Sequence, residues 1–249
     1  MIKSLIEKAI INQSLSKFES LFLRRIYNQD LDPYIRRLAE YKNLQNHSLV
    51  LDLGSGFGQW SLALSKYNRH IVSLELELPR LKVQDNLVQY LKLKNISLCN
   101  SNMLHLPFSD DTFDCIYAYS SIYFEDHTKV LKEMSRILKN QGVIYLNVNS
   151  LGWYIKNLFA RNRKYGEYNI RLMAFKSILS YFIGKLRIKK LPGSQCILKP
   201  KSLVKHLNSL GFDYISISED GGKSDYKFFK NRYIFFTSVY EVMGVINKC

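Results

Sequence analysis

The feature that most constrains this chain is the stretch LVLDLGSGFGQW at residues 49–60, where an apolar run gives way to three glycines at alternate positions. A short, continuous apolar run that ends in glycine is typical of a strand buried on both faces of a parallel sheet. Glycine tolerates positive φ and has no Cβ, so the backbone of such a loop can lie against a bound ligand. The same residues can also serve only to turn the chain from a strand into a helix. Both interpretations stay open at this point.

Strand-like and helix-like segments alternate from residue 48 onward. The expected strands cover residues 48–53, 70–76, 95–100, 113–120 and 143–149, followed by two closing strands at 213–220 and 232–243 joined by a hairpin turn at 218–225. The expected helices cover residues 59–67, 79–93, 127–142 and 201–212, and we expect Gly142 to close the third of them. This alternation predicts an α/β fold, a Rossmann-like seven-stranded, mostly parallel sheet with helices on both faces.

Composition indicates an ordinary globular protein. Hydrophobic residues make up 47% of the chain and charged residues 23%, a balance that argues against disorder. The four cysteines include no CxxC pair, so neither a zinc site nor a disulfide framework is indicated, and we expect a reducing compartment. Charges recur every few residues over residues 1–27, so we expect neither a signal peptide nor a membrane span there. We therefore expect a cytoplasmic protein, with the inner membrane surface as an alternative location.

Glu75 favours the ligand-binding interpretation of the glycine loop. It ends the second expected strand, about twenty residues after the loop, where an acidic side chain can accept hydrogen bonds from ribose hydroxyls. Nicotinamide-binding proteins share this feature, but their GxGxxG fingerprint needs a third glycine where this chain has Gln59. The spacing therefore argues against a dinucleotide cofactor.

Several motifs in order resemble the class I S-adenosylmethionine-dependent methyltransferases, in particular their small-molecule, type 11 branch. VLDLGSGFG resembles the first motif of that family, IVSLELE its second-strand motif, and NSNMLHLPFSDDTFDCIYAYSSIYF and EMSRILKNQGVIYL its later motifs. The resemblance implies S-adenosyl-L-methionine as the cofactor, with Glu75 on the ribose, Leu76 beside the adenine and Asn102 near the adenine amino group. The full set of cofactor-binding residues that it implies is Asp52, Gly54, Ser55, Gly56, Phe57, Gly58, Glu75, Leu76, Asn102, Met103 and Ser120.

The chain departs from the family pattern at three positions. Asn102 replaces an aspartate, which keeps a hydrogen-bonding side chain but loses its charge. Tyr123 stands where many relatives have histidine, and Gln141 replaces a common glycine. None of these changes abolishes cofactor binding on physical grounds.

The sequence identifies neither a general base nor a metal site. Methyl transfer from a sulfonium needs mainly alignment, so a base helps only an acceptor that must lose a proton. Tyr123 and His127 are weak candidates for such a base, and His105 and His206 are weaker. Asp110, Asp111 and Asp114 cluster, but they fall in a turn and at a strand start, so we expect a metal-free in-line displacement.

Basic residues are concentrated in one segment. The net charge is +15, and residues 151–201 contribute 12 basic residues against Glu167 alone. This excess of positive charge favours an anionic partner.

We expect one methyltransferase domain over residues 1–249. It is divided into a helical cap at 1–46, a cofactor-binding core at 47–150, a basic, aromatic helical insertion or lid at 151–201, between the fifth and sixth strands, and a closing helix and strands at 202–249.

The insertion supports more than one interpretation. Leu172, Phe175, Leu179, Ile183 and Leu186 recur at helical spacing, so the plainest expectation is a helix that packs this stripe on the core and turns its cations to solvent. Alternatively, cations and aromatic rings form a lid over a small or glycan-like, anionic acceptor, or residues 170–190 contact an anionic membrane. Nucleic acid is a less favoured partner. We therefore expect a methyltransferase for a small or glycan-like acceptor. An RNA- or lipid-directed methyltransferase and a non-catalytic nucleic-acid- or membrane-binding protein stay as alternatives.

Overall fold

The computed structural model describes residues 2–159, 164–165, 168–184, 191–222, 224–229, 232–233 and 235–248. Its central sheet has seven strands in the order β3-β2-β1-β4-β5-β11-β8, and β11 is antiparallel to both of its neighbours. The strands are β1 (Val50–Leu53), β2 (Ile71–Glu75), β3 (Ile96–Asn100), β4 (Phe113–Tyr119), β5 (Leu138–Asn149), β8 (Phe212–Glu219) and β11 (Val239–Ile246). The predicted seven-stranded, mostly parallel sheet is confirmed.

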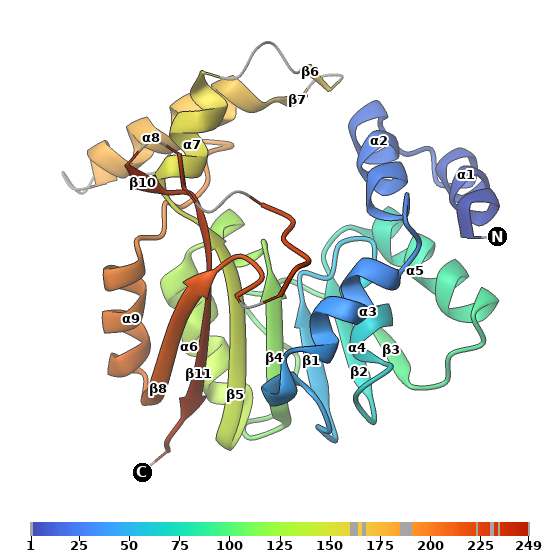
Figure 1. The fold of residues 1–249 in the computed structure, drawn as a ribbon, viewed down its shortest axis with the longest axis horizontal. Helices are drawn as coiled ribbons and strands as arrows, with labels where there is room; N and C mark the ends of the chain where they lie inside the picture. The colour runs from blue at the N-terminus through green and yellow to red at the C-terminus, as the bar shows by residue number, and fades with distance from the viewer. Residues whose placement is uncertain are drawn as a thin grey trace.

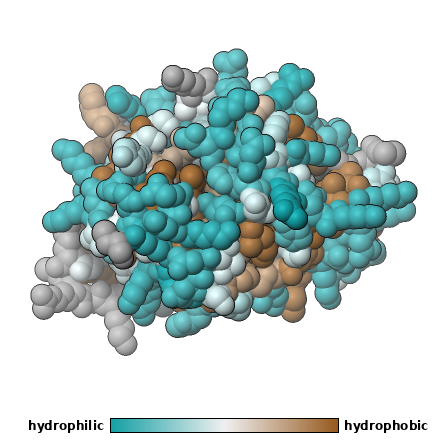
Figure 2. Space-filling view, turned by 90° about the horizontal axis from the view of Figure 1, so that it is seen from below, coloured by the Kyte–Doolittle hydropathy of each residue, from teal (hydrophilic) through white to brown (hydrophobic). Residues whose placement is uncertain are grey.

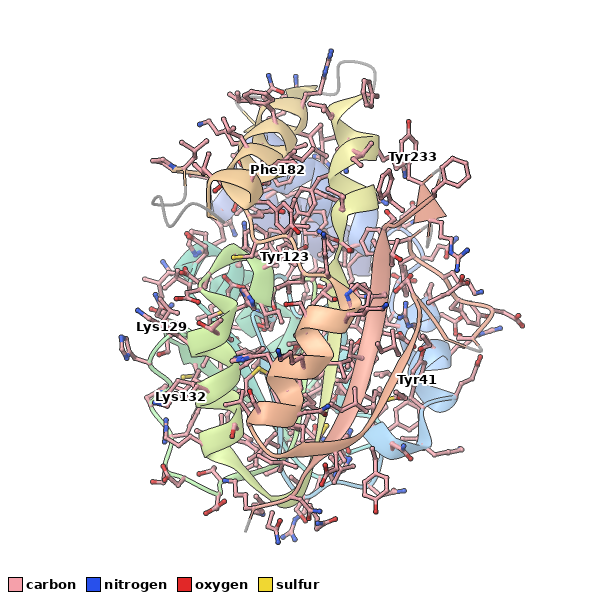
Figure 3. All side chains as sticks on the ribbon, turned by 90° about the vertical axis from the view of Figure 1, so that its left-hand side faces the viewer. Tyr41, Tyr123, Lys129, Lys132, Phe182 and Tyr233 are labelled. Atoms are coloured by element: carbon pink, nitrogen blue, oxygen red, sulfur yellow. The ribbon has the colours of Figure 1, made fainter. Side chains whose placement is uncertain are left out.

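Helices cover both faces of this sheet (Figure 1). One face packs on α6 (His127–Ile137) and α9 (Pro200–Ser209) through the cluster that includes Leu131 and Leu207. The other face packs on α3 (Asp32–Ala39), α4 (Gln59–Leu64) and α5 (Leu78–Tyr90) through the cluster that includes Leu38, Trp60 and Leu87. Figure 3 shows the two layers on either side of the sheet, with Lys129 and Lys132 on α6 at the left and Tyr41, which follows α3, at the right. Because β1 is buried and paired with β2 on one side and β4 on the other, the loop that follows it is held between these strands at the carboxyl edge of the sheet.

The N-terminal cap consists of α1 (Ile2–Asn12), α2 (Lys17–Ile26), α3 and the short 3₁₀ helix η1 (Lys42–Leu44). A capping box fixes the start of α2, because Ser16 Oγ accepts from the backbone N–H of Glu19 while the Glu19 carboxylate accepts from the N–H of Ser16. The start of α2 is therefore set by local hydrogen bonds, and the cap contacts the core through α3.

The end of α6 differs from the prediction. The helix ends at Ile137 rather than at Gly142, and β5 begins immediately at Leu138, which pairs with Phe113. Within β5, where the pairing with β4 shifts register between Leu138 and Val143, Gln141 has a φ of +63°, whereas Gly142 does not have positive φ. The left-handed residue is thus Gln141, at the position where the related motif has a glycine.

The insertion after β5 contains α7 (Leu151–Leu158), the short strands β6 (Lys164–Tyr165) and β7 (Tyr168–Asn169), and α8 (Ile170–Gly184). The paired strands β6 and β7 correct the expectation of helices alone. The two helices pack on each other around Tyr154, Met173 and Ala174. They lie over the carboxyl ends of the parallel strands, across from α1 and α2 (Figure 1).

The closing strands also differ from the prediction. β11 begins at Val239 rather than at residue 232, because β9 (Arg232–Tyr233) and β10 (Phe236–Thr237) form a separate antiparallel pair. The segment between β8 and β11 is therefore not the simple hairpin turn expected at 218–225. It brings the buried side chain of Asp220 beneath the backbone of Phe228 and Phe229, whose N–H groups donate to it.

Candidate active site

The glycine loop lies at the carboxyl edge of the sheet, and its three glycines differ in function. All three have positive φ, at +74° for Gly54, +61° for Gly56 and +84° for Gly58. A Cβ on Gly54 would lie 2.6 Å from Ser121 Cβ, and one on Gly58 would lie 2.8 Å from Gln84 Cγ. A Cβ on Gly56 would meet nothing within 4 Å. Gly54 and Gly58 therefore allow close packing, while Gly56 faces open space, as a ligand-binding glycine does.

Glu75 holds this loop in place. Its carboxylate is buried, and Oε2 accepts a hydrogen bond of 2.8 Å from the N–H of Gly56. Oε1 accepts from the N–H groups of Leu76 and Glu77, each at 3.0 Å. The side chain of Leu76, by contrast, is half exposed. The second strand thus brings a carboxylate and an exposed apolar residue to the open side of the loop, the arrangement expected for a ribose and an adenine.

A buried polar chain supports the loop from below. Asp52 Oδ2 lies 2.5 Å from Ser61 Oγ, which lies 2.7 Å from Ser73 Oγ, and Ser73 Oγ donates to Gln84 Oε1 at 2.6 Å. The Gln84 amide then donates to Ser55 Oγ at 2.9 Å and to the Gly56 carbonyl at 2.7 Å. Burial raises the pKa of Asp52 to about 7. Asp52 is therefore placed under the loop, where it anchors α4.

Sequence reasoning missed Gln84, although a signal existed. Gln84 falls on the buried side of α5, three residues from both Leu81 and Leu87. A polar residue on an apolar helical face must find hydrogen-bond partners, and here those partners are the glycine loop and Ser73.

Met103, Asn102 and Ser120 also lie at this edge. The Met103 methyl carbon is 3.4 Å from where a Cβ on Gly54 would stand, so Met103 borders the loop. Asn102 Oδ1 accepts a hydrogen bond of 2.8 Å from the N–H of Leu104. Ser120, with a φ of +55°, donates through Oγ to Asn147 Oδ1 at 3.0 Å. All three side chains are partly exposed.

Phe57 is placed differently from the rest of the loop. Its side chain is fully buried, its ring packs near Phe22 of the cap, and its carbonyl accepts a 2.8 Å hydrogen bond from the Tyr27 hydroxyl. Phe57 therefore joins the cap to the loop and is not exposed on the open side.

The two weak candidates for a base lie beyond β4. Tyr123 belongs to the 3₁₀ helix η2 (Ile122–Phe124), is buried in the core, and packs against the ring of Phe124. It lies beneath the insertion in Figure 3, and its carbonyl accepts from the N–H of Cys196. His127 begins α6, but the N-cap of that helix is Asp126, which accepts from the N–H of Thr128. Asp126, rather than His127, therefore caps the amino end of α6.

A buried ionic cluster lies at the carboxyl ends of β4, β5 and β8. Arg37 is 1% exposed, and its Nη2 donates to Asp220 at 2.8 Å, Glu241 at 2.9 Å and the Tyr145 hydroxyl at 2.9 Å. The Tyr119 hydroxyl donates to Asp220 at 3.0 Å. Each carboxylate is thereby satisfied by several donors, as buried charges require. No motif in the sequence indicated this cluster.

Asn149 is the last residue of β5 and is 1% exposed. Within the described part of the chain, neither its amide nitrogen nor its amide oxygen has a hydrogen-bond partner. Strand alternation places it on the same face as Asn147, which donates to Asp220. A buried side chain that lacks both a donor and an acceptor partner is costly, which makes Asn149 a candidate for contact with a ligand.

The three clustered aspartates are each paired with a cation. Asp110 pairs with Arg136 at 2.9 Å, Asp111 with Lys248 at 2.5 Å and Asp114 with Lys139 at 2.7 Å. Over the described ranges, no group of three or more His, Cys, Asp or Glu side chains could hold a metal ion. These carboxylates therefore act as surface ion-pair partners.

Comparison with known protein sequences finds the same core. Residues 51–146 match a family model described as a methyltransferase domain. The chain is 35% identical over 117 residues to an uncharacterized protein of Methanocaldococcus jannaschii, covering 46% of this chain and 47% of that one. It is 32% identical over 94 residues to the uncharacterized methyltransferase YcgJ of Bacillus subtilis, covering 37% of each. The chain thus spans half or less of the length of these two relatives.

A longer alignment joins the chain to a demethylmenaquinone methyltransferase of Listeria welshimeri, 28% identical over 190 residues, or 73% of this chain and 77% of that one. Among solved structures, an S-adenosylmethionine-dependent methyltransferase from Clostridium acetobutylicum superposes with a TM-score of 0.63 at 16% identity, covering 90% of this chain and 97% of that one. The structure of YcgJ superposes with a TM-score of 0.58 at 15% identity, covering 87% and 99%. These structures share the fold described above.

Proposed function

We propose that this protein is a class I S-adenosylmethionine-dependent methyltransferase of the type 11 branch, and that it transfers a methyl group from S-adenosylmethionine to a small acceptor. The observation that carries the proposal is the pairing of the open glycine Gly56 with the Glu75 carboxylate on the same edge of the sheet. Both belong to the matched residues 51–146.

The residues present fit this cofactor. Gly56 leaves room beside the backbone, Glu75 offers carboxylate oxygens at the end of β2, and Leu76 offers an exposed apolar surface. Met103 borders Gly54 at the same edge, where Asn102 and Ser120 are partly exposed. Ser55 is buried and supports the loop through the Gln84 amide. When bound, S-adenosylmethionine supplies a methyl group on a sulfonium sulfur, already activated for in-line displacement by an acceptor atom.

The chain then has to align the acceptor and keep water away. The cap and the insertion flank the carboxyl edge on opposite sides (Figure 1). Tyr119 of β4 and Asn147 and Asn149 of β5 bring polar groups to this edge. We infer that Asn149 hydrogen-bonds the acceptor, because its buried amide offers an unused donor and an unused acceptor. A hydroxyl or carboxamide on the acceptor would satisfy both.

We further propose that the acceptor is small, anionic or glycan-like. The support is the composition of residues 151–201, with 12 basic residues and one acidic. The two described helices of this segment, α7 and α8, lie over the carboxyl edge of the sheet (Figure 1). A second acceptor class is favoured by the relatives named demethylmenaquinone methyltransferases, one of which aligns over 73% of this chain.

An assay of S-adenosylhomocysteine formation tests this proposal. The panel should include sugar phosphates, nucleotide sugars and a demethylmenaquinone analogue. We expect turnover with one class, and we expect Asn149→Leu to lower kcat/KM for that acceptor by roughly 10- to 100-fold without changing cofactor affinity. Asn208→Leu, on the exposed face of α9, is the control. Unchanged kcat/KM in Asn149→Leu would overturn the assignment of Asn149, and no turnover across the panel would contradict the proposed acceptor classes.

A further inference from the structure

Helix α8 presents its apolar side to solvent. Leu172, Phe175, Leu179 and Phe182 are 49%, 52%, 39% and 54% exposed. With about 100° between successive residues of an α-helix, these four side chains fall within roughly 80° of arc. They form one stripe along the helix, which we call the α8 stripe. The expectation that Leu172, Phe175 and Leu179 pack on the core is therefore wrong, whereas Ile183 is partly buried. Leu186, the last member of the apolar pattern expected from the sequence, lies outside the described residues.

The inward side of α8 is small and polar instead. Its buried residues are Met173, Ala174, Ser177 and Ser180. Ser177 Oγ accepts a 2.8 Å hydrogen bond from the N–H of Gln195, and Ser180 Oγ donates to Ser194 Oγ at 2.9 Å. These bonds fix the rotation of the helix. The α8 stripe is therefore exposed because a hydrogen-bonded seam holds the opposite side inward.

Cations border the α8 stripe on both edges. By the same helical geometry, Arg171 lies just beyond Phe182 on one edge and Lys176 just beyond Leu172 on the other. Arg171 donates to the Leu158 carbonyl and Lys176 to the Pro192 carbonyl. Among the described residues, neither cation is paired with a carboxylate. An apolar stripe with cations on both sides matches the chemistry of an anionic lipid surface.

The cap carries a similar feature at the same end of the molecule. On α2, Leu21 and Phe22 are each 40% exposed, and Lys17 and Arg25 lie on the same short helix. Figure 1 places α2 and α8 at the upper end of the molecule, on either side of the carboxyl edge of the sheet. Seen from the opposite end, hydrophilic residues cover most of the surface (Figure 2). The two exposed apolar features thus share the end at which the candidate active site lies.

We propose that α8 docks this protein on the surface of an anionic phospholipid bilayer, with the α8 stripe inserted among the lipid headgroups and acyl chains and Arg171 and Lys176 at the phosphates. At about 1.5 Å per residue the 15 residues of α8 extend roughly 22 Å, a length suited to lying in the interface plane. No helix in the described part of the chain is long and apolar enough to cross a bilayer. The proposal concerns docking and does not depend on methyl transfer.

Vesicle flotation of the full chain tests the docking. The vesicles should contain phosphatidylcholine alone or phosphatidylcholine with 30% phosphatidylglycerol, at about 0.15 M salt. We expect the protein to float with the anionic vesicles and to remain unbound with the neutral ones. Leu172→Ser/Phe175→Ser/Phe182→Ser should lower the bound fraction at least about tenfold, because the apolar contact is lost. Arg171→Gln/Lys176→Gln should lower it by about fivefold for each cation removed.

Matched variants on β8 control for exposed apolar surface elsewhere. Tyr214 and Ile217 are 84% and 46% exposed, and Tyr214→Ser/Ile217→Ser should bind vesicles as the unaltered chain does. Circular dichroism and cofactor titration of each variant confirm that the fold is retained, which separates lost docking from lost folding or lost cofactor binding. Equal flotation with both kinds of vesicle, no flotation, or flotation that survives the α8 substitutions would overturn the proposal. So would a dimer in sedimentation velocity that the α8 substitutions dissociate, because a second copy would then cover the α8 stripe.

Discussion

Glu75 and Gly56 are joined by a 2.8 Å hydrogen bond from the backbone N–H of the glycine to a buried carboxylate oxygen. The same carboxylate accepts two further backbone N–H groups, from Leu76 and Glu77. Glu75 therefore stabilises the conformation of the glycine loop through these hydrogen bonds, in addition to its expected contact with the ribose of the cofactor.

Glu75→Ala should weaken S-adenosylmethionine binding by roughly 1–3 kcal/mol, because a charged acceptor is lost from both the loop and the ligand. Glu75→Gln keeps one acceptor oxygen and should lose less. Isothermal titration calorimetry measures both. Glu77→Ala, at an exposed neighbouring position, is the control and should bind as the unaltered protein does. An unchanged affinity in Glu75→Ala would refute the assignment of this residue.

Alanine substitutions at two glycines with positive φ distinguish the effect of backbone strain from the effect of ligand contact. Gly56 and Gly193 have φ values of +61° and +72°, and a Cβ on either would meet no atom within 4 Å. Alanine at either position should cost about 1 kcal/mol of unfolding free energy, because a Cβ disfavours the left-handed region. Only Gly56→Ala should also weaken cofactor binding, by about tenfold or more, since its Cβ occupies the ligand side of the loop. Equal cofactor affinity in the two variants would show that Gly56 does not face the cofactor.

The polar chain beneath the loop should make stability depend on pH. Three short contacts link Asp52, Ser61, Ser73 and Gln84, but the two serine hydroxyls supply only two protons. The third bond forms when Asp52 is protonated, which agrees with burial raising the pKa of Asp52 to about 7. Between pH 4 and about 7 the folded protein then holds a proton that the unfolded chain has released.

It follows that Asp52 lowers the unfolding free energy as pH rises from about 4 to about 7, with little further change from this residue above that range. Asp52→Asn supplies the third donor at every pH. We expect the stability of this variant relative to the unaltered protein to rise over that window, by up to about 4 kcal/mol. Urea unfolding at pH 5 and pH 8 measures the difference. A constant offset between the two proteins would mean that Asp52 keeps an ordinary pKa.

Adjacent arginines on α3 provide a test of the buried ionic cluster. Arg37 is buried against Asp220 and Glu241, whereas Arg36 forms an exposed pair with Asp32. Arg37→Met should cost about 3–5 kcal/mol of unfolding free energy, because two carboxylates lose their buried cation. Arg36→Met should cost at most about 1 kcal/mol. Chemical denaturation of the two variants makes the comparison, and similar losses would contradict the burial of the cluster.

The parts of the fold that could be predicted are those with local signals. The run at Val50–Leu53, the glycines after it and the acidic end of β2 fall within one short stretch, and each leaves a pattern in the sequence. The end of α6 was missed because neither glycine nor proline marks the change from helix to strand at Ile137 and Leu138, and the glycine expected to close the helix, Gly142, lies inside β5.

The Arg37 cluster could not be predicted from such signals. Its partners Tyr145, Asp220 and Glu241 lie 108, 183 and 204 positions away, so only the tertiary fold brings them together. The orientation of α8 has a similar origin. Helical periodicity identified the apolar stripe, but the seam through Ser177 and Ser180, which turns that stripe outward, depends on residues 191–195.

The central claim is that the loop around Gly56 and Glu75 binds an adenosyl methyl donor. Parallel calorimetric titrations with S-adenosylmethionine, S-adenosylhomocysteine and NAD test it most directly. The structure predicts micromolar binding of the two adenosyl compounds, at one site per chain, and no binding of NAD. Binding of NAD alone, or of none of the three, would contradict it.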